Sequence, residues 1–168
     1  TSLGRLRHQL LSGTKLNTLA VAKKIFPVSH YTGEKLSALL PQDQESKIQV
    51  IPNGVNTSVF SPREKNKDII SKYKLTGRNV FLSVGRLLPH KGIDQTLAAL
   101  AGLKAVNENF SYFILGSGPD RQRLEKIRDT YHLENHVHFV GSRHINDLVD
   151  LYNLADIFIL PSREELPH

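Results

Sequence analysis

The chain has 168 residues, of which 39% are hydrophobic, and its formal net charge is +6. This length fits one domain, or one domain and part of another, and no apolar run approaches the roughly 18 residues that a membrane-spanning helix needs. The absence of cysteine excludes disulfides, thiolate catalysis and cysteine-bound zinc. There is no methionine either, so Thr1 is not a translation start and we expect a fragment or a processed product. The first residues lack the apolar core of a secretory signal, and we expect a cytoplasmic protein.

The positive charge is compatible with nucleic acid, an anionic membrane surface or a phosphorylated small molecule as partner. Nucleic-acid binding is favoured by a long basic stripe with interleaved aromatic residues. Here the cations are dispersed, apart from a group near the start of the chain. We therefore expect no nucleic-acid partner.

The first 51 residues predict short, unevenly spaced elements. These are a loose helical pattern over 1–23 that Gly13 interrupts, a strand at 24–28, a helix from about 31 to 40, a polar connector at 41–47 and a strand at 48–51. Ser29 is placed to cap the helix. A hydrophilic stretch follows, and we place an interdomain linker at 52–66 and a second domain at 67–168.

The second domain alternates regularly between strands and helices. We expect strands at 80–84, 110–115, 136–140 and 156–160, and helices at 67–73, 93–105, 120–131 and 145–153. The runs Val80-Phe81-Leu82 and Ile157-Phe158-Ile159-Leu160 are continuously apolar, which indicates strands buried on both faces. This order predicts an α/β fold with a Rossmann-like, doubly wound parallel sheet.

The turn after the first of these strands has the composition of a phosphate site. Gly85 leaves the backbone open to a ligand, and Arg86 and Lys91 lie near the start of the next helix. The N–H groups and the dipole of a helix N-terminus also favour an anion. The alternative is that both cations are ordinary loop charges and Gly85 only makes a turn.

The next strand ends in Gly116-Ser117-Gly118-Pro119. This turn lacks the third glycine of a dinucleotide fingerprint, which argues against nicotinamide cofactors. Its two glycines either permit a tight strand-to-helix turn or contact a ligand, and Pro119 suits the first turn of a helix.

Eight histidines raise the question of a metal site. His136 and His138 alternate on a predicted strand and should point to the same face, with His132 and His144 nearby. Nothing in the sequence supplies the further ligands and supporting carboxylates that zinc needs, so we expect no metal. His90, beside Lys91, is either functional or an exposed loop residue.

Four segments, in this order and spacing, resemble glycosyltransferase family 4, the retaining, GT-B-fold enzymes of glycosyltransferase group 1. They are Val50-Ile51-Pro52-Asn53-Gly54-Val55-Asn56 with Phe60, Ser83-Val84-Gly85-Arg86-Leu87 with Lys91-Gly92, Leu115-Gly116-Ser117-Gly118-Pro119, and 137–141 leading to Leu151-Tyr152 and 155–162. The resemblance extends from about residue 24 to the end.

The resemblance implies a donor site in the C-terminal of two Rossmann-like domains. Arg86 and Lys91 would bind the diphosphate of a nucleotide-sugar and assist catalysis. The other donor-binding candidates are Gly85, Gly116, Gly118, Ser142 and Arg143, the last two bordering the nucleobase. Residues 1–51 would be the end of an N-terminal acceptor domain, through which the protein contacts a glycan or lipid-linked acceptor and the membrane periphery. No cofactor or metal is implied.

The family also places two glutamates, eight positions apart, just after the Pro-Ser that corresponds to Pro161-Ser162. Glu164 and Glu165 are therefore candidates for the first of them, Glu164 as a donor-binding and Glu165 as a catalytic residue. Residues 163–168 could instead begin an insertion found in some members. The second glutamate does not occur before His168, so the resemblance implies an inactive fragment.

Three functions remain compatible with the sequence. The first is the donor-binding part of a retaining glycosyltransferase. The others are a non-catalytic nucleotide-sugar-binding module and a related GT-B epimerase or phosphorylase.

Overall fold

The structure is a computed structural model that describes residue 13 and residues 17–163. The chain divides into two compact units between Asn56 and Thr57. This division falls inside the linker predicted at 52–66, and the assignment of the first unit to an acceptor domain stays a prediction. In the described part of the chain, no helix has both the length and the apolar character required to cross a bilayer.

The first unit contains helix α2 (His30–Ser37) and the 3-10 helix η1 (Gln42–Lys47). The predicted cap of α2 is confirmed, because Ser29 Oγ accepts a hydrogen bond from the Thr32 N–H at 3.1 Å. The connector predicted at 41–47 forms the 3-10 helix η1. Gly13 is itself in a helical conformation, and the residues on either side of it, 1–12 and 14–16, lie outside the described residues. The rest of the pattern expected over 1–23 lies largely outside the described residues.

The two segments predicted as strands in this unit pair with each other. Ile25 and Ile48 form a parallel bridge, and the Gln49 N–H donates to the Ile25 carbonyl at 2.9 Å. Their pairing extends no further than this bridge and its flanking hydrogen bonds, so neither segment is a regular strand.

The second unit is built on a four-stranded parallel sheet, as predicted. Its strands are β1 (Asn79–Val84), β2 (Phe110–Leu115), β3 (Val137–Gly141) and β4 (Ile157–Phe158), in the order β3-β2-β1-β4. Strand β4 is shorter than the predicted 156–160, although the Ile159 N–H still donates to the Leu82 carbonyl at 2.8 Å. The carboxyl ends of all four strands meet at one edge of the sheet.

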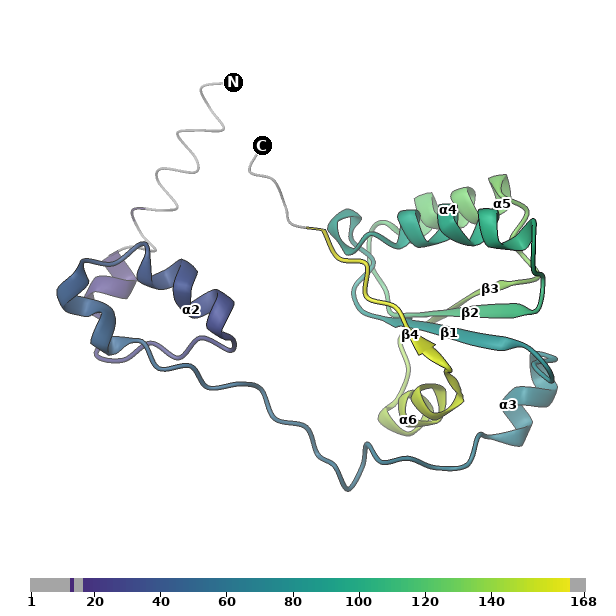
Figure 1. Ribbon diagram of the computed structural model, residues 1–168, viewed down its shortest axis with the longest axis horizontal. Helices are drawn as coiled ribbons and strands as arrows, with labels where there is room; N and C mark the ends of the chain where they lie inside the picture. The colour runs from purple at the N-terminus through teal and green to yellow at the C-terminus, as the bar shows by residue number, and fades with distance from the viewer. Residues whose placement is uncertain (1–12, 14–16, 164–168) are drawn as a thin grey trace. The chain divides into compact units, whose positions relative to one another are not determined.

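Helices cover both faces of this sheet (Figure 1). The helices are α3 (Lys67–Lys72), α4 (Ile93–Lys104), α5 (Arg121–Thr130) and α6 (Ile145–Leu154), and a short 3-10 turn, η2 (Pro89–Lys91), precedes α4. Helices α4 and α5 lie on one face, and α3 and α6 on the other. Pro119 comes just before the N-cap of α5, Asp120, and so precedes the first helical turn that it was expected to suit.

The core has two layers, one on each face. Residues of α4 and α5, such as Leu97 and Leu124, pack on Phe110 and Tyr112 of β2. On the opposite face, Leu151 and Leu154 of α6 are among the residues packed in the second layer. All six residues of β2 are buried. In β1, where burial on both faces was predicted, Val80 and Leu82 are buried and Phe81 is half-buried. The same prediction for 157–160 is wrong: β4 is an edge strand, and Ile157 and Phe158 are exposed.

The prediction that His136 and His138 share a face is wrong. Strand β3 begins at Val137, so His136 lies in the preceding turn, where strand alternation does not apply. The His136 ring stacks on Phe110 with centroids 4.7 Å apart, whereas the His138 ring lies 4.9 Å from Phe113. Phe110 and Phe113 belong to opposite core layers, so the two imidazoles are separated by the sheet.

Candidate functional site

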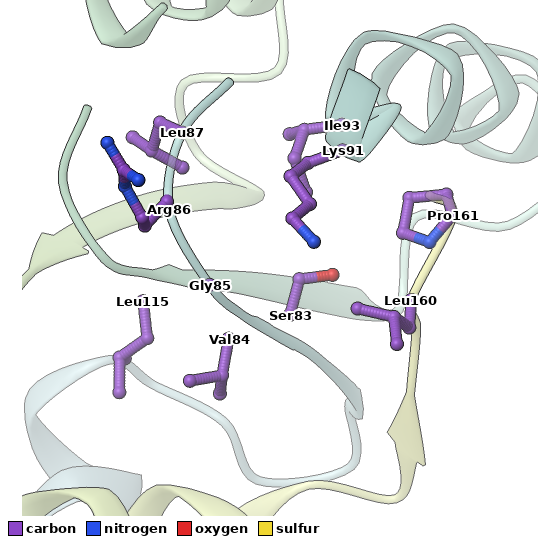
Figure 2. Close-up of a pocket in the computed structure, with 10 residues that line it drawn as sticks. All are labelled: Ser83, Val84, Gly85, Arg86, Leu87, Lys91, Ile93, Leu115, Leu160 and Pro161. Atoms are coloured by element: carbon purple, nitrogen blue, oxygen red, sulfur yellow. The ribbon is translucent and has the colours of Figure 1, made fainter. Parts of the chain in front are cut away.

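A narrow pocket opens at the carboxyl edge of the sheet, where β1, β2 and β4 end (Figure 2). It is lined by Ser83, Val84, Gly85, Arg86, Leu87, Lys91, Ile93, Leu115, Leu160 and Pro161. Its volume of about 10 Å³ has room for about one water molecule. A larger ligand would therefore contact the rim. The structure brings Gly85, Arg86 and Lys91 together at this pocket, as the sequence analysis expected.

The two cations of the pocket come from one connection, the loop between β1 and α4. Figure 2 shows the Lys91 side chain directed into the pocket, whereas that of Arg86 points away from it. Neither side chain forms an ion pair with the part of the chain that the structure describes. Within the described residues, therefore, no carboxylate neutralises either charge.

The start of α4 is packed closely against the segment that follows β4. Gly92, the N-cap of α4, has a φ of 69°, which is in the left-handed region. A Cβ at this position would lie 2.0 Å from the Pro161 carbonyl oxygen. Only glycine satisfies both conditions without displacing the backbone, so Gly92 allows Pro161 to form one wall of the pocket.

The turns after β1 and β2 are joined backbone to backbone. The Leu87 N–H donates to the Ser117 carbonyl at 2.9 Å. A Cβ on Gly116 would lie 1.8 Å from the Gly85 oxygen, and one on Gly118 would lie 2.2 Å from the Leu87 oxygen. The two glycines thus have a packing role, and their contact with a ligand stays a prediction. Gly85 differs, because a Cβ there would have no atom within 4 Å.

The two residues expected to border a nucleobase, Ser142 and Arg143, follow β3 but lie in different surroundings. Ser142 lies beside the β2 turn, with its Oγ 3.3 Å from Ser117 Oγ. Arg143 lines a different pocket of about 150 Å³, together with Ile69, Lys72, Tyr73, Val140, Asp147 and Leu151. The structure therefore does not bring Arg143 to the pocket that Arg86 and Lys91 line.

A buried polar chain lies under the pocket and was missed by the sequence analysis. The Tyr112 hydroxyl donates to Ser83 Oγ at 2.7 Å, and Ser83 Oγ donates to the Ile159 carbonyl at 2.5 Å. Burial raises the pKa of Tyr112 to about 12, so the phenol stays neutral. These bonds join β1, β2 and the segment after β4. The signal in the sequence was a serine inside an apolar strand.

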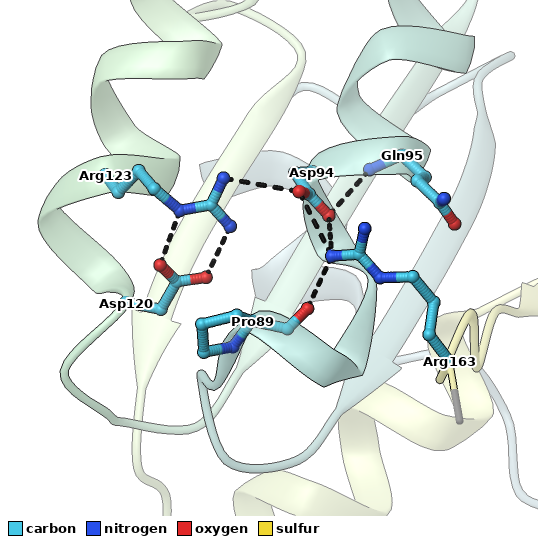
Figure 3. Close-up of polar contacts among 6 residues, drawn as sticks. All are labelled: Pro89, Asp94, Gln95, Asp120, Arg123 and Arg163. Carbon is cyan, nitrogen blue, oxygen red and sulfur yellow. Dashed lines mark hydrogen bonds and ion pairs between the residues drawn. The ribbon is translucent and has the colours of Figure 1, made fainter. Parts of the chain in front are cut away.

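A second missed feature is a set of ion pairs beside the η2 turn (Figure 3). Arg123 binds both oxygens of Asp120, at 2.6 and 2.7 Å, and also Asp94 at 3.2 Å. Arg163 binds Asp94 at 3.0 and 3.2 Å. Partial burial alone would raise the pKa of Asp94, but the hydrogen bond from Arg123 and the charge of Arg163 outweigh it and lower that pKa. Asp94 is therefore ionised at neutral pH.

The two glutamate candidates, Glu164 and Glu165, lie outside the described residues, and their roles stay predictions. Arg163, the last described residue, comes directly before them.

The structure is a Rossmann-like domain with two cationic residues, Arg86 and Lys91, at the carboxyl edge of its sheet, the edge where open α/β sheets bind their ligands. Residues 64–166 match the family model of glycosyl transferases group 1. This match covers more than half of the chain, which therefore belongs to that family.

Two curated relatives are named for transfer to phosphatidylinositol lipids. The GDP-mannose-dependent alpha-(1-6)-phosphatidylinositol monomannoside mannosyltransferase of Mycobacterium tuberculosis is 28% identical over 137 residues, which are 81% of this chain and 35% of the relative. A phosphatidylinositol N-acetylglucosaminyltransferase subunit of Schizosaccharomyces pombe is 27% identical over 152 residues, 88% of this chain and 31% of the relative. The chain thus spans about a third of the length of these relatives.

Among solved structures, Anabaena HepE in complex with UDP superposes with a TM-score of 0.71 and 19% sequence identity. The match covers 84% of this chain and 38% of HepE. The likeness supports the same fold, the Rossmann-like α/β architecture of GT-B glycosyltransferases.

Proposed function

We propose that this chain is the donor-binding part of a retaining glycosyltransferase, which transfers a sugar from a nucleotide-sugar to a glycan or lipid-linked acceptor. The observation that carries the proposal is the pair of cations, Arg86 and Lys91, on one loop at the carboxyl edge of the sheet. The similar proteins support it, since HepE was solved with UDP and the mycobacterial relative is GDP-mannose-dependent. Both curated relatives are named for lipid acceptors.

The chemistry needs stabilisation of a leaving group. When the bond between the sugar anomeric carbon and the diphosphate oxygen breaks, negative charge builds on the diphosphate. Lys91, Arg86 and the N-terminus of α4 are positive groups at this edge, and positive groups held in place before the reaction stabilise such charge without having to reorganise. Removing one cation should cost about 2–4 kcal/mol in the transition state, as for other preorganised anion sites. No cofactor or metal is part of this proposal.

Retention of configuration follows if the acceptor oxygen attacks the face of the sugar that the diphosphate leaves. The acceptor proton passes to the departing diphosphate, and no protein nucleophile is required. In this proposal, Glu164 or Glu165 holds hydroxyl groups of the donor sugar, and Gly116, Gly118 and Ser142 lie along the nucleotide.

Isothermal titration calorimetry with UDP, GDP, UDP-glucose and GDP-mannose tests the donor site. We expect binding of at least one diphosphate, unchanged by EDTA, and a loss of roughly tenfold or more in affinity for Arg86→Ala and for Lys91→Ala, because each removes a charge-assisted contact. The matched control is Lys104→Ala, at the other end of α4, where Lys104 Nζ bonds the His132 carbonyl. Unchanged affinity in both site variants would show that the phosphate assignment is wrong.

A further inference from the structure

We propose that Asp94 and Arg163 are positioning residues, which hold Lys91 and the segment after β4 at a fixed spacing around the donor diphosphate. The inference rests on the proposed function and adds two residues that have no assigned part in it. Neither side chain lines the pocket, so both act through their neighbours.

Arg163 holds the two residues that come just before Lys91. Its backbone N–H donates to the His90 carbonyl at 2.7 Å, and its Nη2 donates to the Pro89 carbonyl at 2.6 Å. These carbonyls belong to η2, a turn of only three residues. In this proposal, the direction of the Lys91 side chain therefore depends on Arg163. This residue lies 74 positions after Pro89 and 69 positions after Asp94 in the sequence.

Asp94 fixes the guanidinium of Arg163 and is itself fixed. It accepts from Arg163 through both carboxylate oxygens and from Arg123 through one. Arg123 is held in turn by Asp120, whose side chain is only 6% exposed. The start of α4, the start of α5 and the segment after β4 are thus joined by one chain of charged groups (Figure 3).

The exposure of these pairs argues that they matter for geometry more than for stability. The side chains of Arg163 and Arg123 are 40% and 45% exposed, and ion pairs at such exposure contribute little to folding. Their location is specific, however, because Pro161 already packs on Gly92 at this point.

The test is a double-mutant cycle with Lys91, measured by calorimetry on the 168-residue chain with UDP and GDP. We expect Asp94→Asn and Arg163→Gln each to weaken diphosphate binding about tenfold, since small displacements of a site residue have effects of this order or larger. In the Lys91→Gln background, the same substitutions should change the affinity by less than about twofold, because they act through Lys91. Arg163→Lys should restore part of the affinity.

Two controls separate this effect from general damage to the fold. Thermal unfolding of Asp94→Asn and Arg163→Gln should have nearly the midpoint of the unmodified chain. Lys65→Gln removes an ion pair with Asp156 elsewhere in the same unit, and it should leave diphosphate affinity unchanged.

The outcomes distinguish this inference from the proposed function. If the unmodified chain binds neither diphosphate, or if Lys91→Gln has no effect, the proposed function fails and this inference fails with it. If Lys91→Gln weakens binding but Asp94→Asn and Arg163→Gln do not, the donor site stands and the positioning role is overturned. The positioning role is also overturned if the two substitutions weaken binding equally with and without Lys91, because they would then act directly or through general disruption.

Discussion

His138 is an imidazole enclosed by aromatic rings. Its Nε2 is buried and has no hydrogen-bond partner among the residues that the structure describes, and its ring lies about 5 Å from those of Tyr73 and Phe113. Burial, together with the charges of Arg78 and Arg128, lowers the pKa of His138 to about 4. The ring is therefore neutral in the folded chain at neutral pH.

This lowered pKa predicts a loss of stability in acid. The unfolded chain binds a proton at His138 near its ordinary pKa of 6.5, whereas the folded chain does so only near 4. The full difference in pKa corresponds to about 3 kcal/mol, and the partial exposure of His138 reduces this through solvent screening. The free energy of unfolding should therefore fall by roughly 2 kcal/mol, because of this residue, as the pH drops from about 6.5 to about 4. His138→Phe should remove that part of the pH dependence.

Urea unfolding at a series of pH values measures this effect. His132→Asn is the matched control, because His132 is exposed and has a φ of 53°, which asparagine tolerates. An unchanged pH dependence in His138→Phe would contradict the assignment.

The turns after β1 and β2 pack so closely that a side chain at Gly116 or Gly118 would overlap backbone atoms of the other turn. Gly116 has a φ of 131°, and a Cβ there would overlap the Gly85 carbonyl. Gly116→Ala should therefore destabilise the second unit by at least about 3 kcal/mol, from overpacking and backbone strain together. Gly85→Ala, in open space, should leave stability unchanged and weaken diphosphate binding.

Chemical denaturation and calorimetry of these two variants test both statements. Equal stability of Gly116→Ala and the unmodified chain would contradict the packing of the two turns. Full diphosphate affinity in Gly85→Ala would show that no ligand approaches the backbone at that turn.

Sequence reasoning located the elements of the second unit because their patterns are local. A buried parallel strand needs apolar residues on both faces. The three consecutive apolar residues Val80-Phe81-Leu82 are enough to indicate such a strand. The glycines at 116 and 118 indicated a turn, but the carbonyls that exclude a Cβ there belong to another turn. The pair of Asp94 and Arg163 is separated by 69 positions, and no local pattern records such a contact. The lining of the candidate site was therefore predictable where one loop supplies it, as for Arg86 and Lys91.

The chain consists of two compact units that meet in sequence between Asn56 and Thr57. The residues around this boundary, 51–58, are all exposed. Ile51 and Val55 are 50% and 66% exposed. Limited proteolysis should therefore cleave first within about 51–58, since exposed connecting segments are preferred sites. The resulting second unit should keep its affinity for the diphosphate that the intact chain binds.

Mass spectrometry of the early fragments and calorimetry of the purified product check this prediction. A first cleavage inside β1 to α6, or a loss of diphosphate affinity on cleavage, would contradict the independence of the second unit.

The strand order also determines when β1 can complete its pairing while the chain is being synthesised on the ribosome. Strand β1 lies between β2 and β4, and Ser83 bonds Ile159, which is 76 positions later in the chain. At about 5–20 residues per second, roughly 4–15 seconds separate the two. During that interval one edge of β1 has no strand to pair with, and an unpaired edge invites association with other chains. Leu160 and Pro161 line the pocket, so the pocket is incomplete until the segment after β4 has been synthesised.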